Sequence, residues 1–357
     1  MATRRGFLAS VLLTASLPQL TWADAGAPAY LGAAKEPDGS FALFGLSAAG
    51  EDRFRLPLPA RGHAGAAHPM RPEAVIFARR PGTFARVLDC VTGQVMHDLA
   101  APQGAHFSGH GTYSGNGALL FTGEVNNASG QGQIGIWNVD EGYARQGSFA
   151  SGGIGPHEIM FSVRNNLLVV ANGGIQAALD DERTTLNLET MQPNLTYLSQ
   201  GGEVVDQLLL PAELRLNSIR HLAQAADGTV AFAMQWQGEA GVVTPLLGLH
   251  RPGQSPVLAE MPDMLALRLK GYAGSVAFSG DGARVAISCP RGGLLVVFDR
   301  DGTLQTSHSR ADICGLGSAP DGFFATDGLG GIARVQNGAL HMLNAAPRAW
   351  DNHLITL

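Results

Sequence analysis

A short turn sequence recurs at intervals along this chain, and it constrains the fold more than any other feature. It is found at SGNG (114–117), AADG (225–228), SGDG (279–282) and APDG (319–322), each between two short apolar runs. A second turn type closes later runs at VLDCVTG (87–93), IWNVDEG (136–142) and VFDRDG (297–302). Asp, Asn and Gly accept the tight and left-handed conformations that such turns need. The repeat therefore predicts many short strands separated by tight turns.

Alignment on these turns divides the chain into units of roughly 40 to 60 residues with four strands each, which is the period of a propeller blade. The first strands of the units are expected near His63, His110, His157, His221, Ser275, Cys314 and His353. The last unit holds only one strand, whereas three strands within residues 29–58 precede His63 without a unit of their own. We therefore predict an all-β, seven-bladed β-propeller in which the C-terminal strand completes the N-terminal blade and leaves no open sheet edge. Residues 173–194 form an insertion that we expect as a polar loop over one face.

The N-terminal residues have the pattern of an export signal. Arg4 and Arg5 precede a short apolar run that ends in the small residues Ala23, Asp24 and Ala25. This predicts a cleaved twin-arginine signal peptide at residues 1–25, with an ordinary secretory signal as the alternative. We expect a single propeller domain at 26–357 in a bacterial periplasm, and no integral membrane segment, because no other run reaches the roughly 18 apolar residues of a span.

Charge and cysteine content exclude some classes of protein. The net charge of −6 argues against a nucleic-acid partner, which calls for a basic face. Cys90, Cys289 and Cys314 are too few for a disulfide framework. They are expected as buried small hydrophobic residues, or as one pair plus a free thiol.

Five histidines are expected to line the central channel, because the first strand of each blade lies there. They are His63, His110, His157, His221 and His353. The register is clearest for His110 and His221, which each lie seven residues before a turn glycine. Glycines around the histidines allow neighbouring backbones to approach. Ser275 and Cys314 fill the two remaining positions. His97, His250, His308 and His341 fall on outer strands, where we expect them to be solvated.

Gathered imidazoles cannot all be protonated, because like charges repel at short range. Neutral imidazoles suit transition metals, so the five histidines predict a bound iron or copper ion, or a haem iron at the channel mouth. Glu158 and Asp351 are candidate acceptors that would fix ring tautomers, and Arg220 would favour an anionic ligand. Asn217, Arg220, Lys270 and Tyr272 are expected at one channel mouth. A ring of histidines that bonds only water and carbonyl groups is the alternative.

Several phrases together resemble one bacterial family, the periplasmic domain of unknown function 1513. They are RGHAGAAHPMRPEAVIFARRPGTFARVLDC, GHGTYSGNGALLFTGE, GGIGPHEIMF, NSIRHLA, AFAMQWQG and RAWDNHL. The resemblance covers roughly residues 28 to 357. It implies a propeller-like fold and partners among periplasmic iron-uptake proteins of the imelysin-like and di-haem oxidoreductase-like kinds. It supplies no catalytic residues.

Three functional hypotheses follow. The first is a periplasmic metal-binding propeller that serves as an accessory component of iron acquisition. The second is a metal-dependent oxidoreductase that acts on a small substrate in the channel. The third is a metal-free scaffold that docks a partner protein.

Overall fold

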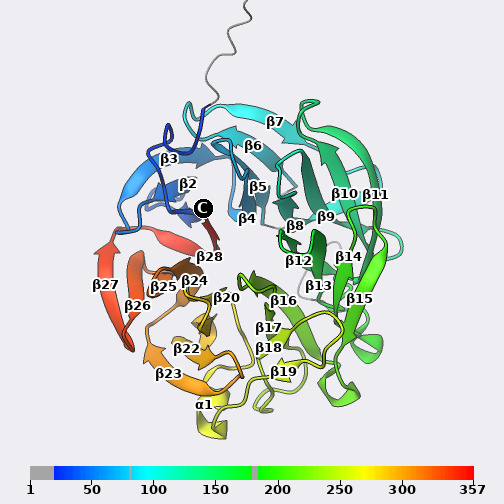
Figure 1. Ribbon diagram of the computed structural model, residues 1–357, viewed down its shortest axis with the longest axis vertical. Helices are drawn as coiled ribbons and strands as arrows, with labels where there is room; N and C mark the ends of the chain where they lie inside the picture. The colour runs from blue at the N-terminus through cyan, green and yellow to red at the C-terminus, as the bar shows by residue number, and fades with distance from the viewer. Residues whose placement is uncertain (1–19, 80–82, 179–183) are drawn as a thin grey trace, which may run out of the picture.

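The computed structural model describes residues 20–79, 83–178 and 184–357, which form strands arranged around a central axis (Figure 1). Five sheets have four antiparallel strands each. The first contains β4 (Gly62–Ala67), β5 (Glu73–Ala78), β6 (Ala85–Asp89) and β7 (Val95–Leu99). The second contains β8 (Ala105–Tyr113), β9 (Leu119–Asn126), β10 (Gln131–Asn138) and β11 (Ala144–Ile154). The third contains β12 (Pro156–Ser162), β13 (Leu167–Asn172), β14 (Asn194–Leu198) and β15 (Val204–Leu209).

The fourth sheet contains β16 (Asn217–Gln224), β17 (Val230–Trp236), β18 (Leu247–His250) and β19 (Val257–Leu258). The fifth contains β20 (Ser275–Phe278), β21 (Arg284–Cys289), β22 (Leu294–Asp299) and β23 (Leu304–Ser309). The helical elements are short: α1 (Asp263–Arg268) and the 3-10 turns η1 (Leu188–Thr190), η2 (Ala212–Leu214) and η3 (Pro290–Gly292). The prediction of an all-β protein is therefore confirmed for the described residues, and the arrangement is propeller-like.

The two ends of the chain meet in one larger sheet of eight strands, ordered β27-β26-β25-β24-β28-β1-β2-β3. Its strands are β1 (Tyr30–Lys35), β2 (Phe41–Leu46), β3 (Asp52–Leu58), β24 (Ile313–Ala319), β25 (Gly322–Asp327), β26 (Gly331–Gln336), β27 (Ala339–Ala345) and β28 (Ala349–Thr356). The C-terminal β28 pairs antiparallel with β1 from Tyr30↔Thr356 to Lys35↔Ala349. Its parallel contact with β24 is a single residue pair, Leu316↔His353. The pairing that joins β28 to β1 is thus far more extensive than the one that joins it to β24.

The recurring turns have one physical basis, which the structure shows in two copies. The Ser114 hydroxyl accepts a hydrogen bond from the backbone N–H of Leu119 at 3.0 Å, and the Asn116 side chain accepts one from Ala118 at 3.1 Å. Ser279 and Asp281 make the same two contacts in SGDG, both at 3.0 Å. Local side-chain acceptors stabilise such turns, and each turn fixes the register of the strands beside it.

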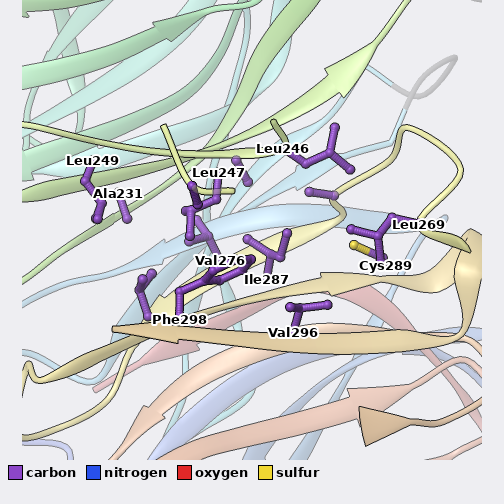
Figure 2. Packing of buried hydrophobic residues seen from close by; sticks show 14 of the residues in the cluster. Ala231, Leu246, Leu247, Leu249, Leu269, Val276, Ile287, Cys289, Val296 and Phe298 are labelled. Atoms are coloured by element: carbon purple, nitrogen blue, oxygen red, sulfur yellow. The ribbon is translucent and has the colours of Figure 1, made fainter. Parts of the chain in front are cut away.

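The core lies between neighbouring sheets. Figure 2 shows one layer, in which Ala231 and Leu249 from one sheet pack in a cluster with Val276, Ile287 and Phe298 from the next. Strands buried on both faces read as continuous apolar runs, as in VAFAMQW of β17, whereas the outer β23 alternates between half-buried and exposed residues. The strands β4, β8, β12, β16 and β20 each form one end of their sheet and lie nearest the axis in Figure 1.

Some expectations about individual segments can be compared with the structure. The insertion at 173–194 contains an antiparallel bridge between Ala177 and Thr185 as well as η1, and its residues 179–183 lie outside the described part. All three cysteines are buried and free, so the alternative with one disulfide pair is wrong.

The expected leader, residues 1–25, lies outside the described part up to residue 19. Of its remaining residues, Trp22 donates from its indole Nε1 to the carbonyl of His68 at 2.9 Å, and Ala25 is buried. Cleavage after Ala25 would remove both contacts. None of the helices in the described residues has the length and apolar character needed to cross a bilayer.

Candidate metal centre

Five histidines from five different strands meet at the axis of the molecule. The cluster comprises His63 on β4, His110 on β8, His157 on β12, His221 on β16 and His353 on β28. In that order, the centroids of successive rings are 5.0, 4.7, 4.9 and 5.0 Å apart, and His353 returns to His63 at 4.5 Å. The rings thus form a closed circuit, which we call the histidine cluster. The structure brings together all five residues that the sequence singled out.

Each of these histidines lies in or beside a break in the pairing of its strand. The register shifts between Gly62 and Gly65 around His63, and between Phe107 and Gly111 around His110. The corresponding shifts on the other strands fall between Pro156 and Ile159, between Ile219 and His221, and between Trp350 and Leu354 on β28. A β-bulge bends a strand and redirects its side chains. The repeated irregularity turns the imidazoles toward the axis.

Glycines beside His110 make room for the cluster. Gly109 has φ +100°, and a Cβ atom built on it would lie 3.0 Å from Cδ2 of the His63 ring. A Cβ on Gly111 would lie 2.7 Å from the carbonyl oxygen of Phe121 and from the Phe77 ring. Any side chain at these two positions would push a neighbouring strand or ring outward. Gly109 therefore sets how closely the His63 ring can approach the strand of His110, and Gly111 allows that strand to pack against Phe77 and Phe121.

Two sets of three side chains in the cluster have the geometry to hold a metal ion. His63, His110 and His157 each offer one ring nitrogen, and these atoms lie within 4.8 Å of one another. His110 also forms a set with Glu158 and His353 under the same limit. His221 belongs to neither set, although its ring lies against those of His157 and His353. His110 is the residue that the two sets share.

The imidazoles are buried and short of hydrogen-bond partners. His110 is 2 % exposed and His221 is 3 % exposed. Among the described residues, Nε2 of His110 and His353 and Nδ1 of His157 have no hydrogen-bond partner, whereas Nδ1 of His63 and of His221 each face a carboxylate, at 3.5 and 3.4 Å. An unpaired buried polar atom is costly, so one on each of three rings in a cluster calls for an explanation. A metal ion satisfies such lone pairs directly.

Burial also keeps four of the five rings uncharged. It lowers the pKa of His110, His157 and His353 well below the ordinary value, and neighbouring imidazoles add to the effect. Arg220 adds to it at His110 and His157, whereas at His353 Arg79 adds to it and Asp351 opposes it. Burial likewise lowers the pKa of His221, although Glu158 opposes it. These rings are neutral near pH 7, which is the form that binds a metal.

Two carboxylates accompany the cluster, as expected, but each faces a histidine from another part of the chain. Glu158 Oε2 lies 3.4 Å from Nδ1 of His221 and accepts the backbone N–H of Leu222 at 3.1 Å. Asp351 Oδ1 lies 3.5 Å from Nδ1 of His63. Burial would raise the pKa of Asp351, yet His63 and Arg61 together hold it well below its ordinary range. Asp351 is therefore an anion beside His63.

Not every residue expected at the axis or its mouths reaches them. Cys314 lies on β24, but its buried thiol is directed at the carbonyls of Trp350 and Asp351, at 3.7 and 3.6 Å. Burial raises its pKa, so it stays protonated and outside the cluster. Asn217 is buried and bonds Thr244 at 2.7 Å.

Two further expectations outside the cluster also fail. Lys270 is exposed and does not line either cavity of the cluster, in contrast to Arg220 and Tyr272. His250, expected to be solvated, is buried and contacts the Tyr197 hydroxyl at 2.9 Å. Packing against the neighbouring sheet, which the sequence does not reveal, decides the place of His250.

Two cavities adjoin the histidine cluster. His63, His157 and His221 line a large cavity of about 1260 Å³, together with Arg220 and Tyr272. His110, Glu158 and His353 line a small cavity of about 610 Å³. Three histidines of the cluster are thus reached from the large cavity and the other two from the small one. Residues of the insertion, Ile175, Ala177 and Thr185, also line the large cavity, so the insertion borders this side of the site.

Comparisons with known proteins support the fold and leave the chemistry open. Residues 56–357 match the model of a family described as "Protein of unknown function (DUF1513)". No curated protein is a significant sequence match. Hydrazine synthase from Kuenenia stuttgartiensis is similar in structure, with a TM-score of 0.61, 14% identity, and 96% of this chain and 100% of that chain covered. A chain of the mitotic checkpoint complex has a TM-score of 0.59 at 10% identity, with 80% and 79% covered. Identities this low show a shared fold alone.

Proposed function

This chain belongs to the family described as protein of unknown function DUF1513, and since that family brings no assigned chemistry, we propose a function from the site itself. The protein is a metal-binding propeller that holds a transition metal, iron or copper, in its histidine cluster. His63, His110, His157, His221 and His353 are the proposed ligand set. Glu158 and Asp351 orient the rings of His221 and His63, and Arg220 biases the site toward anionic ligands.

One observation carries this proposal: five imidazoles from separate strands converge, and ring nitrogens of His110, His157 and His353 have no hydrogen-bond partner among the described residues. Hydrogen bonding among the rings alone leaves these nitrogens unpaired. Imidazole nitrogen is a ligand suited to iron and copper. The bulges and glycines that direct the rings inward form a support that holds the ligands before the metal arrives, which limits the entropic cost of binding.

We propose seven blades. The eight-stranded sheet divides into two blades at the single residue pair between β24 and β28. The blade containing β28, β1, β2 and β3 then closes the ring through the chain ends. Each blade contributes its first strand to the axis, and five of these seven strands carry a histidine of the cluster.

The biological setting is an extension of the same proposal. Residues 1–25 act as a twin-arginine signal, and the mature domain at 26–357 works in the periplasm as an accessory component of iron acquisition. Imelysin-like and di-haem oxidoreductase-like proteins are the proposed partners. The sequence of the leader and the family resemblance support this setting.

Metal analysis of the purified protein tests the function. Protein isolated from the periplasm is expected to contain a stoichiometric transition metal by elemental mass spectrometry. The His110→Ala/His157→Ala double variant should lose it, because these two residues supply two of the three ligands in one set. His97→Ala/His341→Ala, which removes two histidines outside the cluster, is the matched control and should retain the metal. A metal-free wild-type protein that still binds its partner would overturn the proposal in favour of a docking scaffold.

A second function, that of a metal-dependent oxidoreductase, is favoured by the large cavity. It reaches His63, His157 and His221 and leaves one side of the cluster open to a small substrate. Reversible redox titration of the bound metal, with a substrate-dependent change in its visible spectrum, would support catalysis. The same spectrum distinguishes a haem iron at the cavity mouth from a mononuclear ion by its intense Soret band.

A further inference from the structure

The large cavity is strongly cationic. Four arginines line it, namely Arg61, Arg79, Arg220 and Arg291, and the described lining contains no carboxylate. Arg61 is neutralised from behind by the buried Asp351, at 2.7 Å between Nε and Oδ2. The charges of Arg79 and Arg291 act on anything that approaches the histidine cluster from this side.

Two of these arginines have no carboxylate partner among the residues that the structure describes: Arg79 and Arg291. Arg291 lies over the ring of Tyr272, with its guanidinium carbon 4.2 Å from the ring centroid. Such a contact orients the guanidinium without cancelling its charge. An oriented, uncompensated guanidinium is suited to bidentate binding of a carboxylate or phosphate.

The cavity also has the size and walls of a ligand site. Its volume of about 1260 Å³ exceeds what a single ion and its water need. Trp236 and Tyr272 supply flat walls, and His221, only 3 % exposed, lies among the lining residues. A ligand in this cavity would contact both the arginines and the metal ligands.

A bare metal cation would be repelled on this route. Arg79 and Arg291 line the cavity that leads to His63, His157 and His221, and their positive charge raises the energy of an incoming cation. A metal that arrives inside an anionic complex is attracted instead. Carboxylates of that complex can bind the arginines, while the imidazoles replace those carboxylates as ligands of the metal.

We propose that the large cavity binds polycarboxylate anions and admits the metal as an anionic polycarboxylate complex. This inference rests on the proposed function, since it names the form in which the metal of that site arrives. Exchange is a ligand substitution without redox change: carboxylate–metal bonds break as imidazole–metal bonds form, and the free polycarboxylate leaves.

Citrate is the probe for the test. Isothermal titration of the metal-free full-length protein with citrate should show binding that weakens as salt is added. Arg79→Gln/Arg291→Gln should bind citrate at least about tenfold more weakly, because each arginine supplies a charge-assisted contact. Arg53→Gln/Arg86→Gln removes the same charge from outside the cavity and should leave the affinity unchanged. Metal uptake from ferric citrate should be slower in Arg79→Gln/Arg291→Gln than in the wild-type protein, whereas metal uptake from the aquated ion should not be slower.

The outcomes separate the two proposals. Equal citrate affinity in the wild-type protein and in Arg79→Gln/Arg291→Gln would overturn this inference while metal loading stands. Absence of metal uptake from both citrate and aquated sources would overturn the proposed function and the delivery route together. Citrate binding lost only in the cavity variant, with the aquated metal still taken up, supports the inference.

Discussion

Replacement of His110 by alanine should damage the metal site more than replacement of any other single histidine in the cluster. Its ring centroid lies 5.0, 4.7, 6.5 and 4.8 Å from those of His63, His157, His221 and His353. It is also common to both sets of candidate ligands, so its loss leaves two members in each. His221 belongs to neither set. His221→Ala should therefore have the smaller effect.

The size of the effect can be bounded. Loss of a residue that only orients a ligand commonly weakens metal binding 10–100-fold, so we expect loss of His110 to exceed about 100-fold, or about 2.7 kcal/mol. At a free metal concentration of about 100 times the wild-type Kd, metal stabilises the wild-type fold by about 2.7 kcal/mol. In His110→Ala the same concentration should stabilise it by no more than about 0.4 kcal/mol.

Competition with a chromophoric chelator measures the affinities, and melting curves with and without metal measure the linked stability. His341→Ala, at an exposed site on β27, serves as the control. Melting of each metal-free variant separates loss of packing from loss of metal. Wild-type affinity in His110→Ala, or a larger loss in His221→Ala, would refute the assignment of His110 as the shared ligand.

Three further predictions test the support of the site, the proposed closure by the chain ends and the acid stability of the fold. Gly109→Ala should weaken metal binding, because its Cβ would lie 3.0 Å from the His63 ring. Gly104 has a similar positive φ with nothing within 4 Å of its Cβ position, so Gly104→Ala should cost only about 1 kcal/mol in unfolding free energy. Chelator competition would show the difference in metal affinity between the two variants. Deletion of residues 349–357 removes the partner strand of β1 and should give aggregates by size-exclusion chromatography, and a stable monomer would contradict the closure that we propose.

The third of these concerns acid stability. Burial opposes ionisation of Asp227, but the Thr229 N–H and arginines hold its pKa at about 2. Because this pKa is depressed in the folded state, the stabilisation is present above about pH 4 and is lost as the pH falls toward 2. Asp227→Asn should thus lose under about 1 kcal/mol at neutral pH, since the pair is partly exposed, and should match the wild type near pH 2 in acid denaturation.

The sequence predicted the histidine cluster because strand register follows from turn chemistry. His110 and His221 share one spacing to the turn glycines, and their two turns share one side-chain contact: Asn116 accepts the N–H of Ala118, and Asp227 accepts the N–H of Thr229. A periodic pattern with a local physical cause can be read without a structure. The pairing of β28 with β1 followed in the same way from counting strands.

Contacts between sheets could not be predicted from the same pattern. The bulge between Phe107 and Gly111 depends on how two backbones pair, and Glu158 faces His221 of the next sheet instead of its neighbour His157. Cys314 has the expected position along its strand, yet its thiol is directed at β28. Arg79 and Arg291 lie far apart in the chain and meet only at the cavity. In each case the outcome depends on how separate strands pair or pack, which leaves no local sequence signal.

X-ray absorption spectroscopy of the metal-loaded protein tests the central claim most directly. The proposed site predicts at least three imidazole nitrogens at about 2.1 Å from the metal, with the multiple-scattering signature of histidine rings. That signature should be lost in His110→Ala. A first coordination shell of oxygen alone, or an unchanged spectrum in this variant, would contradict the assignment of the metal to the histidine cluster.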